Sequence, residues 1–105
     1  MAEESQTAWK ASLDQERGMV LIEGEVDFTN SLDVRDWLQR HCQETPGDLH
    51  LDLSRLSYID SSGLAVLIEI RKHLKATNRV IRIEAVSGQV QKLFTLTQLG
   101  ELFGI

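Results

Sequence analysis

A short strand that leads into a helix start constrains the fold of this chain more than any other stretch. Leu49, Leu51 and Leu53 alternate with polar residues, which is the period-two pattern of an extended segment with two different faces. A few residues later, Asp60-Ser61-Ser62 precede an apolar pattern of helical period, and their side-chain oxygens suit a helix N-cap. The stretch therefore predicts a strand joined to a helix by a polar turn.

Other stretches predict further strands and helices. The run 19–22 is apolar and partly β-branched, which is typical of a strand buried on both faces, and Gly24–Asp27 ends that strand. The turn 14–18 before it should let Gly18 adopt a positive φ. In order, the chain predicts strands at 8–13 and 19–22, a helix at 30–41, a strand at 49–53, a helix at 62–75, a strand at 80–83 and a short helix capped by Ser87-Gly88.

Alternating strands and helices predict one α/β domain that spans residues 1–105, with residues 1–6 frayed. A mixed sheet of four or five strands should form through right-handed crossovers, with the helices packed against it. A chain of this length can fold around one core without a metal or a disulfide. The residues expected to be mostly buried are Val34, Trp37, Leu38, Leu51, Leu53, Leu64, Leu67, Ile68, Ile81, Ile83, Leu93 and Phe94, and the apolar tail of Leu96, Leu99, Leu102, Phe103 and Ile105 should pack onto the same core.

Charge and composition exclude some classes of partner. The net charge is −5, whereas nonspecific nucleic-acid binding needs a basic surface and anionic lipid attracts basic segments. Residues 1–5 are acidic and lack the regions of a signal peptide, and no apolar run is long enough for a transmembrane helix. The single cysteine, Cys42, cannot form an internal disulfide. We therefore expect a cytoplasmic protein that neither binds nucleic acid nor inserts into a membrane.

The residues offer little for catalysis, a metal or a cofactor. The sequence has neither a GxxxxGK[ST] phosphate loop nor GxGxxG, and its three histidines lie far apart along the chain. A nucleophilic serine needs a positioned base, and the Asp-Ser-Ser turn has none beside it in the sequence. Asp27 with Asp60 fits a carboxylate pair or a magnesium site, but two helix caps near one sheet edge explain them as well. We expect no catalytic residue, metal or cofactor.

Asp27 and the Asp60-Ser61-Ser62 turn follow strands that point the same way, so they should meet at one edge of the sheet. Functional crevices of open α/β sheets lie outside the carboxyl ends of the strands. A helix N-terminus offers unpaired N–H groups and partial positive charge, which suits an attached phosphate. Gly63 in the first turn costs about 1 kcal/mol relative to alanine, which indicates close approach by another chain or a ligand. The simpler alternative is that Asp-Ser-Ser is an ordinary helix cap.

Three motifs in this order resemble the STAS domain family, which includes the anti-sigma factor antagonists of bacteria. Tyr58-Ile59-Asp60-Ser61-Ser62-Gly63-Leu64 is similar to the core motif of the family. Gly24-Glu25-Val26-Asp27 resembles its Gly-x-aliphatic-Asp, and the segment 87–94 resembles its late helix, where a proline commonly stands at the place of Gly88. The resemblance spans nearly the whole chain and implies a single STAS-like domain.

The resemblance implies a phosphorylation-controlled binding switch. In such proteins the unphosphorylated antagonist binds an anti-sigma factor that is also a serine kinase, and this frees a sigma factor. The kinase then phosphorylates the first hydroxyl residue after the motif aspartate, here Ser61, and a PP2C-type phosphatase removes the phosphate. We expect Ser61 to be the last residue before the helix and Ser62 to lie in its first turn. The residues expected to bind the partner are Asp27, Thr29, Asn30, Tyr58, Asp60, Ser61, Ser62, Gly63 and Leu64.

A second class of function stays open. STAS domains also serve as accessory subunits bound to the ATPases of ABC transporters, as in bacterial phospholipid transport. The segment 51–55 resembles that branch too, although its members often have threonine at the place of Ser61. There the domain is a constitutive interaction module. A stressosome-like scaffold is a more distant alternative.

Overall fold

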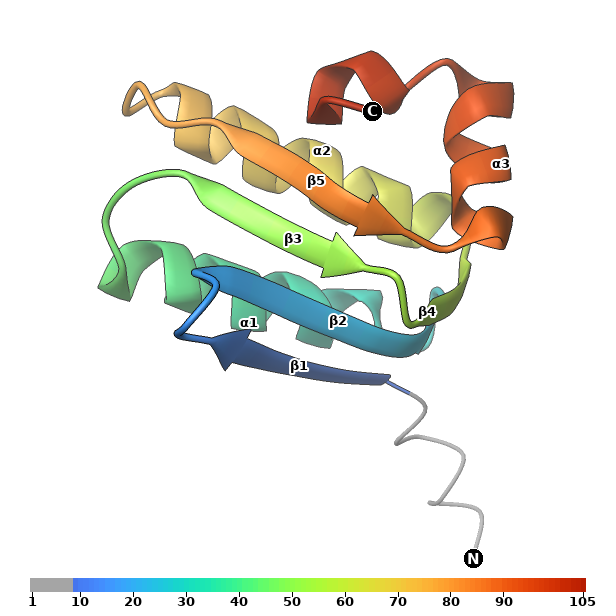
Figure 1. Ribbon diagram of the computed structural model, residues 1–105, viewed down its shortest axis with the longest axis horizontal. Helices are drawn as coiled ribbons and strands as arrows, with labels where there is room; N and C mark the ends of the chain where they lie inside the picture. The colour runs from blue at the N-terminus through green and yellow to red at the C-terminus, as the bar shows by residue number, and fades with distance from the viewer. Residues whose placement is uncertain (1–8) are drawn as a thin grey trace, which may run out of the picture.

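The structure, a computed structural model, describes residues 9–105 (Figure 1). The expected strand start at Ala8 and the expected frayed segment 1–6 therefore lie outside the described residues. The elements are β1 (Trp9–Asp14), β2 (Met19–Val26), α1 (Ser31–Glu44), β3 (Leu49–Leu53), β4 (Leu56–Ile59), α2 (Ser61–Lys75), β5 (Ile81–Val86), α3 (Gly88–Thr97) and a 3-10 helix, η2 (Gly100–Phe103).

The strands form one mixed five-stranded sheet in the order β1-β2-β3-β5, and β4 also pairs with β2. β1 and β2 are antiparallel, and the tight turn between them has Gly18 at φ +65°. β2 pairs in parallel with β3 and β4, and β3 pairs in parallel with β5. The expected α/β fold with a mixed sheet is confirmed.

The strand β4 was not expected from the sequence. After Leu53, the turn at Ser54 and Arg55 shifts the chain, which then resumes alongside the far half of β2, where Val26 is opposite Ile59. In the turn, the N–H of Gly24 donates to the carbonyl of Arg55 over 3.0 Å. β4 therefore carries the chain along β2 to its carboxyl end, which places the following turn beside the residues after β2.

Helices cover one face of the sheet. Figure 1 shows α1 and α2 side by side behind β2, β3 and β5, and α3 standing at the end of the sheet near β4. The chain then passes through η2 beside β5 (Figure 1). Among residues 9–105, no helix combines the length and the apolar character that crossing a membrane requires.

The core lies between the sheet and the two long helices. Most residues expected in it are buried, including Leu38 at 0% exposure and Phe94 at 0%, while Trp37, Ile68 and Leu93 are only partly buried at its rim. In the tail, Phe103 is fully buried. One expectation for the tail was wrong: Leu96 is 80% exposed, because it lies on the face of α3 that points away from the sheet.

Burial of β2 also differs from expectation. Val20 and Ile22 are buried, but Met19 and Leu21 are only partly buried, on the face of the sheet opposite the two long helices. The expectation of a strand buried on both faces was wrong, since a continuous apolar run does not show whether both faces are covered.

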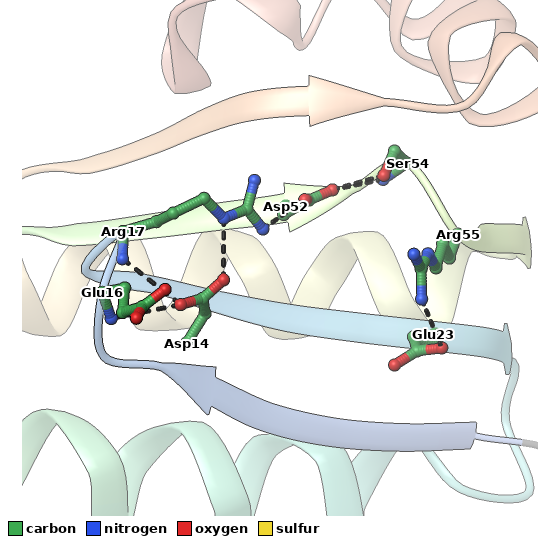
Figure 2. Close-up of polar contacts among 7 residues, drawn as sticks. All are labelled: Asp14, Glu16, Arg17, Glu23, Asp52, Ser54 and Arg55. Atoms are coloured by element: carbon green, nitrogen blue, oxygen red, sulfur yellow. Dashed lines mark hydrogen bonds and ion pairs between the residues drawn. The ribbon is translucent and has the colours of Figure 1, made fainter.

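A polar network ties the β1–β2 turn to β3 on this open face (Figure 2). Arg17 donates from Nε to Asp14 over 2.8 Å and from Nη2 to Asp52 over 2.9 Å. The other carboxylate oxygen of Asp52 accepts from the backbone N–H of Ser54 at 2.9 Å and from its hydroxyl at 2.6 Å. Burial alone would raise the pKa of Asp52, but these hydrogen bonds outweigh it and hold the pKa below its ordinary value.

Two leucines of α1 test where the core lies. Leu38 is fully buried and Leu32 is 60% exposed on the same helix. We expect Leu38→Ala to lower the free energy of unfolding by about 2–5 kcal/mol, because it leaves a cavity. Leu32→Ala should change it by no more than about 0.5 kcal/mol. Urea unfolding of both variants measures the difference, and equal effects would contradict the assignment of the core.

The Asp52 network makes stability depend on pH. A carboxylate with a lowered pKa stabilises the fold above its unfolded pKa of about 3.9, and this contribution is lost as pH falls below that value through the folded pKa. We expect Asp52→Asn to be less stable than wild type at pH 7, and the gap to shrink at pH 3. Urea midpoints at both pH values measure it. A gap of the same size at pH 3 would show that the ionised carboxylate is not what stabilises this site.

Candidate functional site

The carboxyl ends of β2 and β4 bring Asp27 and Asp60 to one edge of the sheet, as expected. The backbone N–H of Asp60 donates to the carbonyl of Val26 over 3.2 Å, which continues the β2–β4 pairing beyond the last strand residues. One carboxylate oxygen of Asp60 accepts from the N–H of Phe28 at 3.1 Å, and the other accepts from the N–H of Gly63 at 3.1 Å. Asp60 therefore caps α2 and holds the β2–α1 loop against it.

Asp27 organises the β2–α1 loop. Its carboxylate accepts hydrogen bonds from the hydroxyl of Thr29 and from the N–H of Thr29, the latter at 2.9 Å. These bonds hold the pKa of Asp27 below its ordinary value. The side chain of Asn30 ties the end of this loop back to its start. It accepts a hydrogen bond from the N–H of Asp27 and donates one to the carbonyl of Glu25, both at 3.0 Å. Both carboxylates thus accept hydrogen bonds from nearby loop and helix groups, but only Asp60 is a helix cap. The expectation that Asp27 is also a cap was wrong, because Asn30 is the N-cap of α1 and Asp27 binds Thr29 within the loop.

α2 begins at Ser61, one residue before the expected start at Ser62, so Ser61 is the first helical residue and not the last residue before the helix. The helix begins here because Asp60, in extended conformation, takes the N-cap position and binds the N–H of Gly63. The side chain of Ser61 is exposed, whereas that of Ser62 is partly buried. Because the first N–H groups of a helix have no intrahelical acceptor, those of Ser61 and Ser62 remain for solvent or a ligand.

Gly63 is buried where α2 approaches the sheet most closely. A Cβ at this position would lie 2.5 Å from Cγ1 of Ile59 and 3.0 Å from Cγ1 of Val26. Glycine is therefore needed here because the first turn of α2 packs directly on β2 and β4. The sequence predicted close approach by another chain or a ligand, whereas in the structure the close contacts come from Ile59 and Val26 of the same chain.

Large apolar side chains are exposed around Ser61. Phe28 is 76% exposed, Leu32 is 60% exposed and Tyr58 is 51% exposed. The backbone of Phe28 is bonded to Asp60, Leu32 lies in the first turn of α1, and Tyr58 stands two residues before Asp60. Apolar groups on the elements that meet at one hydroxyl are typical of a protein-binding surface.

A shallow groove continues this surface toward α3. Its volume is about 220 Å³, and apolar residues of β4 and α3 dominate its lining. Leu96, exposed on α3, forms part of the wall. The lining includes Tyr58, Ile59, Val90, Leu93 and Leu96.

The expected partner-binding residues divide into two groups. Asn30, Gly63 and Leu64 are buried and shape the edge from within, so in the isolated chain they present no exposed side chain. Thr29, Tyr58 and Ser61 are exposed, and Asp27, Asp60 and Ser62 are partly exposed.

Sequence reasoning did not include Phe28 and Leu32 in this surface. One signal was present: Leu32 falls outside the apolar stripe of α1 formed by Val34 and Leu38, so the core does not need it. Phe28 stands in a polar loop, where an aromatic side chain has no helical or strand period to assign it.

Comparisons with known proteins point to one family. The sequence model of the STAS domain matches residues 10–105. A STAS-domain containing protein of Pseudomonas aeruginosa is 32% identical over 94 residues, covering 90% of this chain and 92% of that protein. An anti-sigma-B factor antagonist of Staphylococcus epidermidis is 30% identical over 86 residues, covering 82% of this chain and 80% of that protein.

A solved structure agrees with these relatives. The unphosphorylated form of SpoIIAA, an anti-sigma factor antagonist, superposes with a TM-score of 0.69 at 25% identity, over 91% of this chain and 85% of that chain. The phosphorylated form of SpoIIAA, described as a Bacillus cell fate determinant, has a TM-score of 0.62 at 25% identity, with coverage of 91% and 88%.

Two glycines test the tight packing at the helix start. Gly63→Ala should destabilise the fold by about 1–3 kcal/mol, because the new methyl overlaps Ile59 and Val26. Gly88→Ala is the control: Gly88 also lies in the first turn of a helix, but apart from its chain neighbours and the backbone of its own helix, no atom lies within 4 Å of its Cβ position. Alanine there should be neutral or stabilising by up to about 1 kcal/mol. Thermal unfolding of both variants measures the difference in stability. If the Gly63→Ala variant is as stable as the Gly88→Ala variant, the tight packing at Gly63 is contradicted.

Proposed function

Because this chain belongs to the STAS domain family, we propose that it is an anti-sigma factor antagonist controlled by phosphorylation of Ser61. In its unphosphorylated form the edge around Ser61 binds an anti-sigma factor that is also a serine kinase, and a sigma factor is released. Transfer of phosphate to Ser61 ends the binding. A PP2C-type phosphatase restores the binding form.

One observation carries the proposal: α2 starts with an exposed hydroxyl, and the segments that join at this helix start expose large apolar side chains. Ser61 is accessible to an enzyme that adds or removes phosphate. Phe28 and Tyr58 supply the apolar area that a protein partner needs. The relatives named antagonists, and a solved phosphorylated form in SpoIIAA, support the same assignment.

A phosphate at Ser61 should leave the fold of this chain intact. It adds a charge of about −1.5 to −2 at the N-terminal end of α2, where the helix dipole favours negative charge. The free N–H groups of Ser61 and Ser62 are available to its oxygens. The carboxylate of Asp60 opposes this through repulsion, but it remains held by two backbone N–H groups.

The same phosphate should exclude the partner. An apolar interface packed over Ser61 leaves no room for three further oxygens, and it would have to desolvate their charge. The switch therefore acts at the contact surface and needs no rearrangement of the domain.

Affinity capture from the native cell, followed by mass spectrometry, tests the assignment of partner. We expect the wild-type chain to capture a protein with a histidine-kinase-like ATPase fold, and Ser61→Asp to lose it. Capture of an ABC-transporter ATPase by both forms would reject the proposal in favour of the transporter alternative.

The phosphoacceptor is the next prediction. We expect the captured kinase, given ATP, to modify Ser61 and not Ser62, because the hydroxyl of Ser61 is exposed and that of Ser62 is partly buried. Peptide mass spectrometry locates the phosphate. Phosphate on Ser62 alone, or on neither serine, contradicts the assignment.

Two substitutions at Ser61 separate stability from binding. Ser61→Asp should preserve or raise stability by about 0.3–1 kcal/mol through the helix dipole, yet weaken partner binding by about a hundredfold if desolvation costs about 3 kcal/mol. Ser61→Ala should keep both, because Asp60 rather than Ser61 caps the helix. Gln43→Glu, which adds a similar charge at the far end of α1, is the control. Thermal melting and calorimetric titration measure both quantities, and wild-type binding by a folded Ser61→Asp would refute the switch.

A further inference from the structure

A cluster of cations lies at the end of α2 opposite Ser61. Four of the 11 Lys and Arg residues line one cavity of about 230 Å³, and within the described segment 9–105 Glu101 is the one acidic residue of its lining. Residues of the last turns of α2, of the start of β5 and of η2 line this cavity. The four cations are Arg71, Lys75, Arg79 and Arg82, and we call this the basic cavity.

The fold accounts for only part of this cluster. Arg79 has a structural role, because its guanidinium donates to the carbonyls of Cys42 at 2.9 Å and Thr45 at 3.2 Å at the end of α1. Lys75 lies in the last turn of α2, where the helix dipole favours a cation. Neither reason applies to Arg71 or Arg82.

The cations of the basic cavity form no ion pair within the described part of the chain. Among residues 9–105, no ion pair involves Arg71, Lys75 or Arg82. Arg71 and Lys75 are four residues apart on α2, a spacing at which like charges face each other and repel. The net charge of the whole chain is −5, but this does not remove the local repulsion between the two cations. A bound anion would relieve it.

We propose that the basic cavity binds the phosphate chain of a small oligophosphate, either inorganic or carried by a nucleotide. Guanidinium groups match phosphate oxygens through paired N–H donors, and Arg71 and Arg82 can approach the anion from α2 and β5. The volume is smaller than that of most organic-ligand sites, which are about 300–1,000 Å³. The phosphate groups fill the cavity, and any attached group lies outside it.

This site is separate from the phosphorylation switch. α2 has 15 residues, so about 20 Å separates its two ends. The proposal of anion binding at the basic cavity and the proposal of partner binding at Ser61 can therefore be supported or rejected separately, because different measurements test them.

Titration of the full chain followed by amide NMR tests the proposal. One arm uses inorganic tripolyphosphate and the other uses ATP, at constant ionic strength, with sodium sulfate as the reference anion. We expect saturable shifts centred on Arg71, Lys75 and Arg82 in both phosphate arms, with affinities within about threefold of each other because the phosphate chain is what is bound. Affinity should fall as salt rises. Binding of ATP without tripolyphosphate would overturn recognition of the phosphate chain.

Charge-matched variants identify the site. Lys75→Gln with Arg82→Gln should weaken tripolyphosphate binding at least about tenfold, since two charged donors are lost. Arg40→Gln with Arg55→Gln removes the same charge from exposed positions outside the cavity, and should change affinity less than twofold. The proposal is overturned by equal losses in the two double variants, by the absence of saturable shifts, or by retention on vesicles of anionic lipid with no response to tripolyphosphate.

Discussion

The carboxylate of Asp60 is the interaction on which the functional edge depends. It binds the N–H of Phe28 with one oxygen and the N–H of Gly63 with the other, and so joins the end of β2 to the start of α2. The backbone N–H of Asp60 also donates to the carbonyl of Val26 over 3.2 Å. Together these hydrogen bonds set where Ser61 stands relative to the apolar residues of the neighbouring loop. The close contact of Gly63 with Ile59 then leaves the helix start no freedom to move toward the sheet.

The two ends of α2 have opposite electrostatic character, and this gives the domain two separate surfaces. The N-terminal end carries Ser61 among exposed apolar side chains and two carboxylates that are engaged in hydrogen bonds. The C-terminal end carries the basic cavity. A negative charge added at the first end disturbs only what packs on it, because the fold already accommodates negative charge there. An anion at the second end meets cations that form no ion pair among the described residues.

Sequence reasoning succeeded where burial imposes a period. The alternation at 49–53 and the stripe of α1 are both required by one-sided burial, and the convergence of Asp27 and Asp60 follows from parallel strands. It failed where tertiary neighbours decide. β4 has only Leu56 and Ile59 buried, too few for a pattern, so it was not recognised as a strand. The exposure of Phe28 and the gathering of cations from α2 and β5 depend on contacts between segments distant in the sequence.

Hydrogen–deuterium exchange of the chain with its captured partner tests the central claim most directly. Protection on binding should be confined to the β2–α1 loop with the first turn of α1, residues 27–32, and to the β4–α2 segment, residues 58–64. Phosphorylation of Ser61 should abolish this protection and leave exchange in the sheet core unchanged. Protection confined to the open face of the sheet, or protection that survives phosphorylation, would contradict the assignment of this edge as the controlled contact surface.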